Sequence, residues 1–160
     1  MHKTRNDLFE NVRKLAISLL NARLSDGVDL HYQAKQAHWN VKGPSFIAFH
    51  ELFDKIAATV EDHNDLMAER IVALGGIAEG TMAVAAKQSR LSSYPLNITT
   101  GREHVEALSS ALASFGQSVR KAIDEATGFG DADTADLFTE ISRDTDKNLW
   151  LVEAHNQADR

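Results

Sequence analysis

The sequence contains no cysteine, and only two prolines and nine glycines interrupt its 160 residues. Without cysteine the chain has no disulfide and no thiolate ligand, so histidine and carboxylate side chains must hold any metal ion. Such ligands suit iron, manganese or zinc. Because glycine and proline are the residues that most often break helices, their scarcity favours long helices.

The chain also lacks an apolar run of about 18 residues, so the sequence predicts no membrane span. Its first residues, MHKTRNDLFENVRK, lack the apolar core of a signal peptide, so we expect a cytoplasmic protein and leave association with the nucleoid open. With 43% hydrophobic and 25% charged residues, positions 1–160 should form one globular domain with a short tail at 1–5. The net charge of −6 argues against a surface that binds nucleic acid throughout.

Apolar residues recur at spacings of three and four along most of the chain, which predicts an all-α protein. The long helices are expected over about 6–39, 45–74, 100–128 and 134–154. Thr99 or Thr100 is expected to cap the third of these, with Glu103 placed to complete a capping box. The long connection before it has room for a short helix near 81–88. Four helices with one long connection between the second and third predict a ferritin-like four-helix bundle.

The second predicted helix carries four potential metal ligands within HELFDKIAATVEDHNDLMAER (50–70). On a wheel of 100° per residue they form a strip beside the apolar face, and this strip does not point into the bundle. The four are His50, Asp54, Asp65 and Glu69. At 1.5 Å per residue, His50 and Glu69 lie about 28 Å apart, so one straight helix cannot gather them around one ion.

The positions are nevertheless symmetric about a point between Thr59 and Val60. If this helix lay antiparallel to a copy of itself, His50 and Asp54 of one chain would face Glu69 and Asp65 of the other. His38, at the end of the first predicted helix, would complete each of two identical intersubunit sites. Such mixed nitrogen and oxygen ligands suit Fe(II). The alternative, that these are solvated charges and a simple His50–Asp54 helix pair, stays open at this point.

Five segments together form a distinctive pattern: KQAHWNVKGPSFIAFHELFD (35–54), DHNDLMAERIVALGG (62–76), SYPLNI (93–98), KAIDEA (121–126) and TADLFTEISRDTDKNLWLVEAH (134–155). With this pattern the chain resembles the Dps family, the DNA-binding proteins from starved cells or mini-ferritins. The resemblance covers nearly the whole chain. It implies a hollow dodecamer built from twofold dimers, which oxidises Fe(II), preferentially with hydrogen peroxide, stores the ferric product and so protects against oxidative damage.

By position, the ferroxidase ligands of the family fall on His38, His50 and Asp54 of one subunit and on Asp65 and Glu69 of its twofold partner. The number of irons at each site, one or two, is left open. Trp39 matches a tryptophan near the iron site of the family, and a packing role for it is at least as well supported. No Glu in this chain has a His three residues on, so the ligand motif of a bundle-core di-iron site is absent.

The resemblance also implies DNA binding and an iron-entry channel. For DNA, the chain offers only His2, Lys3 and Arg5 before the first helix, so we expect weak binding; a nucleoid-structural DNA binder is the alternative function. For the channel, Asp131 and Asp136 match acidic positions that line a threefold channel in the family, and Glu140 would extend the path. Acidic residues in this segment would equally cap the fourth helix.

Overall fold

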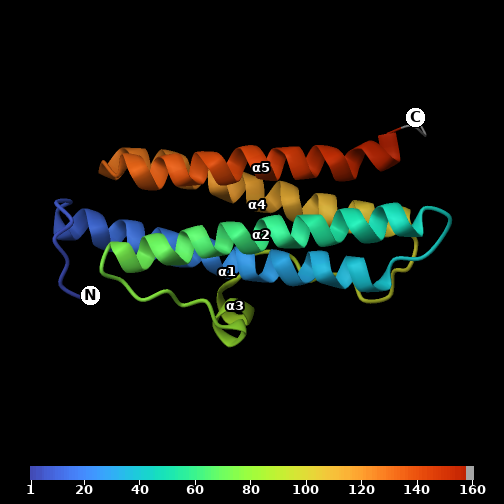
Figure 1. The fold of residues 1–160 in the computed structure, drawn as a ribbon, viewed down its shortest axis with the longest axis horizontal. Coiled ribbons are helices and arrows are strands. Elements are labelled where there is room, and N and C mark those ends of the chain that lie inside the picture. Colours follow the sequence, from blue (N-terminus) through green and yellow to red (C-terminus); the bar gives the residue numbers. More distant parts are fainter. Residues whose placement is uncertain (158–160) are drawn as a thin grey trace.

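The computed structural model describes residues 1–157, which form four long helices and a short one (Figure 1). The helices are α1 (Glu10–Asn40), α2 (Phe46–Ala73), α3 (Met82–Gln88), α4 (Gly101–Phe129) and α5 (Ala132–Gln157). The long helices lie side by side, and α3 packs outside the bundle in the crossover between α2 and α4. The predicted all-α bundle with an extra short helix is confirmed.

Two antiparallel hairpins, α1–α2 and α4–α5, make up the bundle. The N–H of Lys42, after α1, donates to the carbonyl of Thr99, before α4, at 2.9 Å. At the same end, the ring of Phe49 in α2 lies 4.6 Å from that of His155 in α5. The crossover must therefore span the length of the bundle, and it brings α4 back antiparallel to α1.

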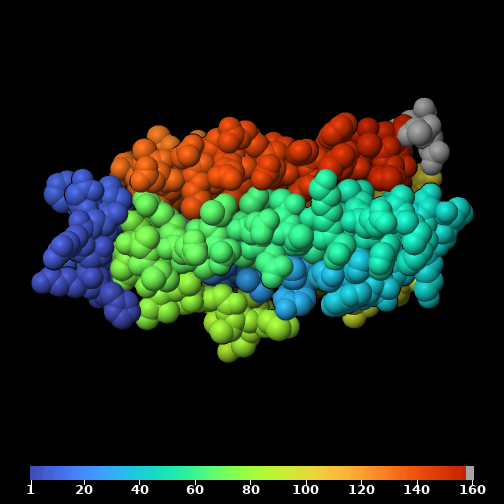
Figure 2. All heavy atoms as spheres, viewed as in Figure 1, coloured from blue at the N-terminus to red at the C-terminus, as the bar shows by residue number. Residues whose placement is uncertain are grey.

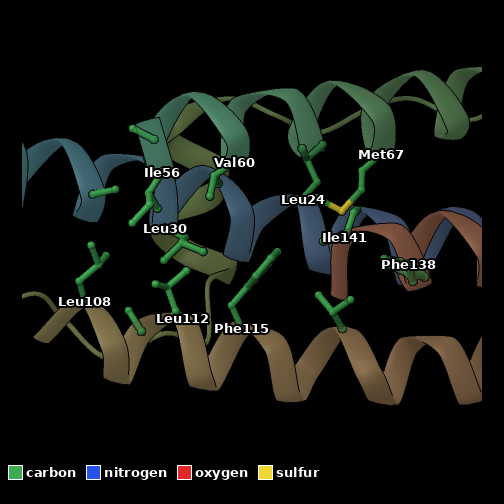
Figure 3. Packing of buried hydrophobic residues seen from close by; sticks show 14 of the residues in the cluster. Leu24, Leu30, Ile56, Val60, Met67, Leu108, Leu112, Phe115, Phe138 and Ile141 are labelled. Atoms are coloured by element: carbon green, nitrogen blue, oxygen red, sulfur yellow. The ribbon is translucent and has the colours of Figure 1, made fainter. Parts of the chain in front are cut away.

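Buried aliphatic and aromatic side chains from all four long helices fill the space between the two hairpins. Phe115 of α4 and Phe138 of α5 are fully buried, and they pack with Leu30 of α1 and Ile56 of α2 in one cluster (Figure 3). Burying a side chain of this size stabilises the fold by about 1.5–3 kcal/mol. The ligand strip of α2 faces away from this cluster.

Gly27 lies in the middle of α1, where the sequence predicts a local weakness of ~1 kcal/mol relative to alanine. The helix runs through it without interruption. A Cβ at this position would lie 2.0 Å from Oδ1 of Asn64 in α2, so a larger residue here would require the Asn64 side chain to move. Glycine therefore lets α1 and Asn64 of α2 pack closely.

Two helix starts differ from the predicted ones, because short polar side chains form a local turn before α1 and a cap before α5. Before α1, the N–H of Leu8 donates to Asn6 Oδ1 at 3.0 Å, and helix begins only at Glu10. Before α5, Asp131 Oδ1 accepts the N–H of Thr134 at 3.0 Å, so helix begins at Ala132 instead of Thr134. The predicted capping box of Thr100 and Glu103 is confirmed.

Asp131 has a second role in the fold, as the partner of a cation on another helix. Its carboxylate is 1% exposed and lies 2.8 Å from Nη2 of Arg70 in α2. It also accepts the hydroxyl hydrogen of Thr134 at 2.6 Å. The same side chain therefore caps α5 and joins it to α2.

We expect Asp131→Ala to lower the stability of the subunit by roughly 3 kcal/mol or more, because it removes a cap and leaves Arg70 without its buried partner. Asp136→Ala is the matched control, since Asp136 is an exposed carboxylate on the first turns of the same helix. Thermal melting of the two variants measures the difference. Equal melting temperatures would contradict the structural role given to Asp131.

Candidate metal centre

Two histidines meet where α1 turns into α2. Gly43, with φ of 120°, provides the left-handed backbone that this turn requires and that other residues rarely adopt. The chain then folds back so that the rings of His38 and His50 stack with centroids 3.7 Å apart. Nδ1 of His38 lies 2.7 Å from the carbonyl oxygen of His50, and Nδ1 of His50 lies 2.9 Å from the carbonyl oxygen of His38.

These reciprocal hydrogen bonds determine which nitrogen of each ring is available. A carbonyl oxygen only accepts, so each Nδ1 must carry the hydrogen, and each neutral ring keeps its lone pair on Nε2. Histidines that bind metals are commonly oriented in this way, through a hydrogen bond from the second ring nitrogen. The donor set of His38 and His50 therefore fits a metal ion bound through Nε2.

Asp54 follows His50 by one helical turn and places a carboxylate near the pair of histidines. Its Oδ1 lies 3.9 Å from Nε2 of His38 and 2.5 Å from Nζ of Lys35. The hydrogen bond from Lys35, aided by the charges of the nearby histidines, holds the pKa of Asp54 below its ordinary value. Asp54 is therefore ionised at neutral pH and ready to bind a cation.

Lys35, which lies on α1 one turn before His38, was not among the predicted site residues. Its ammonium group lies 5.6 Å from the ring centroid of Trp39 and contacts Asp54 as well. The spacing of Lys35, His38 and Trp39 along α1 was the available signal, because residues three and four apart share a helix face. Trp39 is 60% exposed, and its place near an iron site stays a prediction.

Asp65 and Glu69 are exposed on α2, but they lie far from the histidine pair of the same chain. Because α2 is one unbroken helix of 28 residues, Asp65 lies about 16 Å along the axis from Asp54. Within residues 1–157, no three histidine or carboxylate side chains of the single chain are grouped so as to hold a metal ion. The subunit thus stacks His38 on His50, places Asp54 3.9 Å from His38, and leaves Asp65 and Glu69 apart from them.

The strip on α2 also carries two exposed apolar side chains that the sequence analysis did not single out. Ile47 is 60% exposed and Val72 is 59% exposed, and both project in the same direction as Asp54 and Asp65 by helical periodicity. They flank the ligands at the two ends, again symmetrically about the point between Thr59 and Val60. Figure 2 shows α2 as a continuous band across the front of the molecule beneath α5.

The three channel candidates lie at the start of α5 in different settings. Asp136 and Glu140 are exposed, one turn apart. Asp131 is buried and committed to Arg70 and Thr134. The alternative of a helix cap thus applies to Asp131, while a channel role for the three residues stays a prediction.

Comparisons with known proteins agree with this architecture. Residues 17–160 match the family model of the ferritin-like domain. A DNA protection during starvation protein from Agrobacterium fabrum is 45% identical over 156 residues, 98% of this chain and 96% of its relative. The chain belongs to the Dps family.

Solved structures show the same relationship. This Dps chain superposes on "Mycobacterium smegmatis Dps tetragonal form" with a TM-score of 0.91 and 31% identity, over 96% of this chain and 93% of that one. A Dps protein from Vibrio cholerae, described as a member of a superfamily of ferritin-like diiron-carboxylate proteins, gives a TM-score of 0.90 at 21% identity, which supports the fold alone. Among the described helices of this Dps chain, none is long and apolar enough to cross a membrane.

Proposed function

We propose that this Dps protein is a ferroxidase that oxidises Fe(II) with hydrogen peroxide at sites shared by two subunits, and stores the ferric product in a hollow dodecamer. The observation that carries the proposal is the histidine pair, whose Nδ1 atoms are both held by main-chain carbonyls. Such an arrangement prepares two Nε2 atoms for ferrous iron, the substrate. Membership of the ferritin-like Dps family supports the same chemistry.

In the proposed site, each group of the chain has a distinct role. His38 and His50 supply neutral nitrogen ligands, and Asp54 supplies an anionic oxygen ligand once iron replaces Lys35 as its partner. Asp65 and Glu69 of the partner subunit add two further carboxylates. Each ferrous ion loses one electron; hydrogen peroxide accepts two, takes up two protons and becomes two molecules of water.

The pairing of two subunits rests on the exposed strip of α2. When two such helices lie antiparallel about the point between Thr59 and Val60, Ile47 of one meets Val72 of the other. These two side chains, which are 60% and 59% exposed in the single chain, would then be buried at both ends of the interface. Ala58, small and exposed, lies near the crossing point and allows the two helices to approach closely. The interface therefore has apolar contacts of its own, independent of the metal.

DNA binding is the second candidate function, and the names of the relatives favour it. We propose that it is weak in this protein, because each subunit has a net charge of −6 and the basic residues of the tail number only three with His2 included. The tail is also tied to the bundle, since the N–H of His2 donates to the carbonyl of Gly75 at 2.7 Å. It does not extend from the subunit as a free basic arm.

We expect His50→Ala and Asp54→Ala each to slow peroxide-driven oxidation of Fe(II) by at least about tenfold, because each removes a ligand. The absorbance of the ferric product measures the initial rate. Asp124→Ala is the matched control, an exposed carboxylate on α4 away from the site, and it should oxidise iron at the wild-type rate. Wild-type rates in the His50 and Asp54 variants, with the oligomer intact, would contradict the ligand assignment.

A mixing experiment tests whether the site is shared. In a dimer that pairs a His50→Ala subunit with a Glu69→Ala subunit, one site lacks both ligands and the other is intact. Random reassembly of an equal mixture should restore about a quarter of the wild-type sites, since half of the dimers are mixed and each has one good site. Activity after the mixture is dissociated and reassembled measures this recovery. If the mixture stays as inactive as its components, the site does not draw on both chains.

We also propose that Asp136 and Glu140 guide iron into the cavity, with Asp131 holding the start of α5 in place. A ring of carboxylates about a symmetry axis attracts a hydrated dication. Both side chains are exposed on the subunit and lie one turn apart on α5, so copies of them about an axis would form two successive rings.

We expect Asp136→Asn to slow the uptake of iron into the assembled shell while leaving the melting temperature nearly unchanged. Stopped-flow measurement of mineral formation reports the uptake, and a melting curve reports the stability. Asp124→Asn removes the same charge elsewhere and should take up iron normally. A lower melting temperature together with normal uptake would show that Asp136 only stabilises the start of its helix.

A further inference from the structure

A groove of about 480 Å³ runs between α1 and α4, and it includes no residue of α2 or of the ligand strip. The crossover closes part of it with Arg90. Three of its lining side chains are cations, Arg23, Arg90 and Lys121, and one is an anion, Glu125. This excess of positive charge contrasts with the net charge of −6 of the whole chain.

Arg23 is a cation in an unusual place, because the residue is only 3% exposed. Its Nη2 lies 2.9 Å from Oδ2 of Asp26, close enough for an ion pair. The contact is poorly directed, however, and among the described residues neither Nη2 nor Nε of Arg23 has a hydrogen-bond partner. A buried guanidinium with free donors is costly to maintain, so an additional acceptor would stabilise it.

Asp26 is a poor counter-charge for this guanidinium. Burial raises the pKa of its carboxyl group above the ordinary value. Its Oδ1 is already engaged by the N–H of Arg90 at 2.8 Å, a contact that holds the crossover against α1. The ion pair with Asp26 therefore holds Arg23 in place but leaves its Nε and Nη2 without a hydrogen-bond acceptor.

Arg90 and Lys121 supply the exposed part of the cluster. Both are exposed, and within residues 1–157 neither side chain makes an ion pair or a hydrogen bond with the protein. Ser114 and Gln117 of α4 line the same groove and add neutral donors. A planar guanidinium fixed at the base, with two more cations around it, is the usual way in which proteins hold phosphate-like anions.

We propose that this groove is a binding site for a small tetrahedral oxyanion of the phosphate class, with Arg23 at its base and Arg90 and Lys121 around it. The site favours a free anion over the backbone of a nucleic acid for two reasons. Arg23 is only 3% exposed, so little of its side chain can be reached from the groove, and Glu125 with the net charge of −6 repels a polyanion.

Isothermal titration of the assembled, iron-free protein with inorganic phosphate, at constant ionic strength, tests the proposal. Wild-type protein should bind phosphate, and both Arg90→Gln and Lys121→Gln should weaken the binding by about tenfold each. Lys147→Gln removes the same charge from an exposed position on α5 and should bind as the wild type does. All three variants change exposed side chains, so folding and Fe(II) oxidation should be unaffected.

Arg23 is buried, so its variant needs a control for folding. Arg23→Lys keeps the charge but loses the planar fork, and a folded Arg23→Lys protein should bind phosphate more weakly than the wild type. No binding by the wild type, or equal losses in Lys121→Gln and Lys147→Gln, would overturn the proposal. Binding of a DNA duplex that depends on Arg90 and Lys121, in the absence of phosphate binding, would overturn it in favour of a nucleic acid surface.

Discussion

The reciprocal hydrogen bonds between His38 and His50 are the interaction on which the candidate metal centre depends. Each ring is held by the main-chain carbonyl of the other residue, at 2.7 and 2.9 Å, so ring orientation and backbone turn are fixed together. Packing of α1 against α2 along their length brings the end of α1 and the start of α2 together for this exchange. The core of the bundle therefore orients two Nε2 atoms without contributing a ligand.

A second constraint is the rise of the α-helix. Because α2 is straight and unbroken over 28 residues, its two halves cannot serve one ion in the same chain. The five proposed ligands could act together only if the chain paired with a copy, and the symmetric placement of Ile47 and Val72 offers apolar contacts for that pairing. In the proposed function, the same face of α2 both joins the two subunits and supplies metal ligands.

Much of this organisation could be predicted from the sequence, and the failures have identifiable causes. Periodicity and the Gly43–Pro44 break locate the long helices, and Thr100 with Glu103 locates a cap. The start of α5 was misplaced because Asp131 is a cap and a buried ion partner of Arg70, which lies 61 residues away. The spacing along α1 indicates that Lys35 shares a helix face with His38, but its contact with Asp54 depends on how α1 and α2 pack, which spacing alone does not show.

The most direct test of the shared metal centre is a crystal structure of the assembled protein grown with Fe(II) in the absence of oxidant, with anomalous scattering recorded at the iron edge. Our account predicts a peak bound by Nε2 of His50 and a carboxylate oxygen of Asp54 from one chain, and by a carboxylate of Glu69 from the twofold-related chain. A peak held within a single four-helix bundle, or subunits that do not pair through α2, would contradict it.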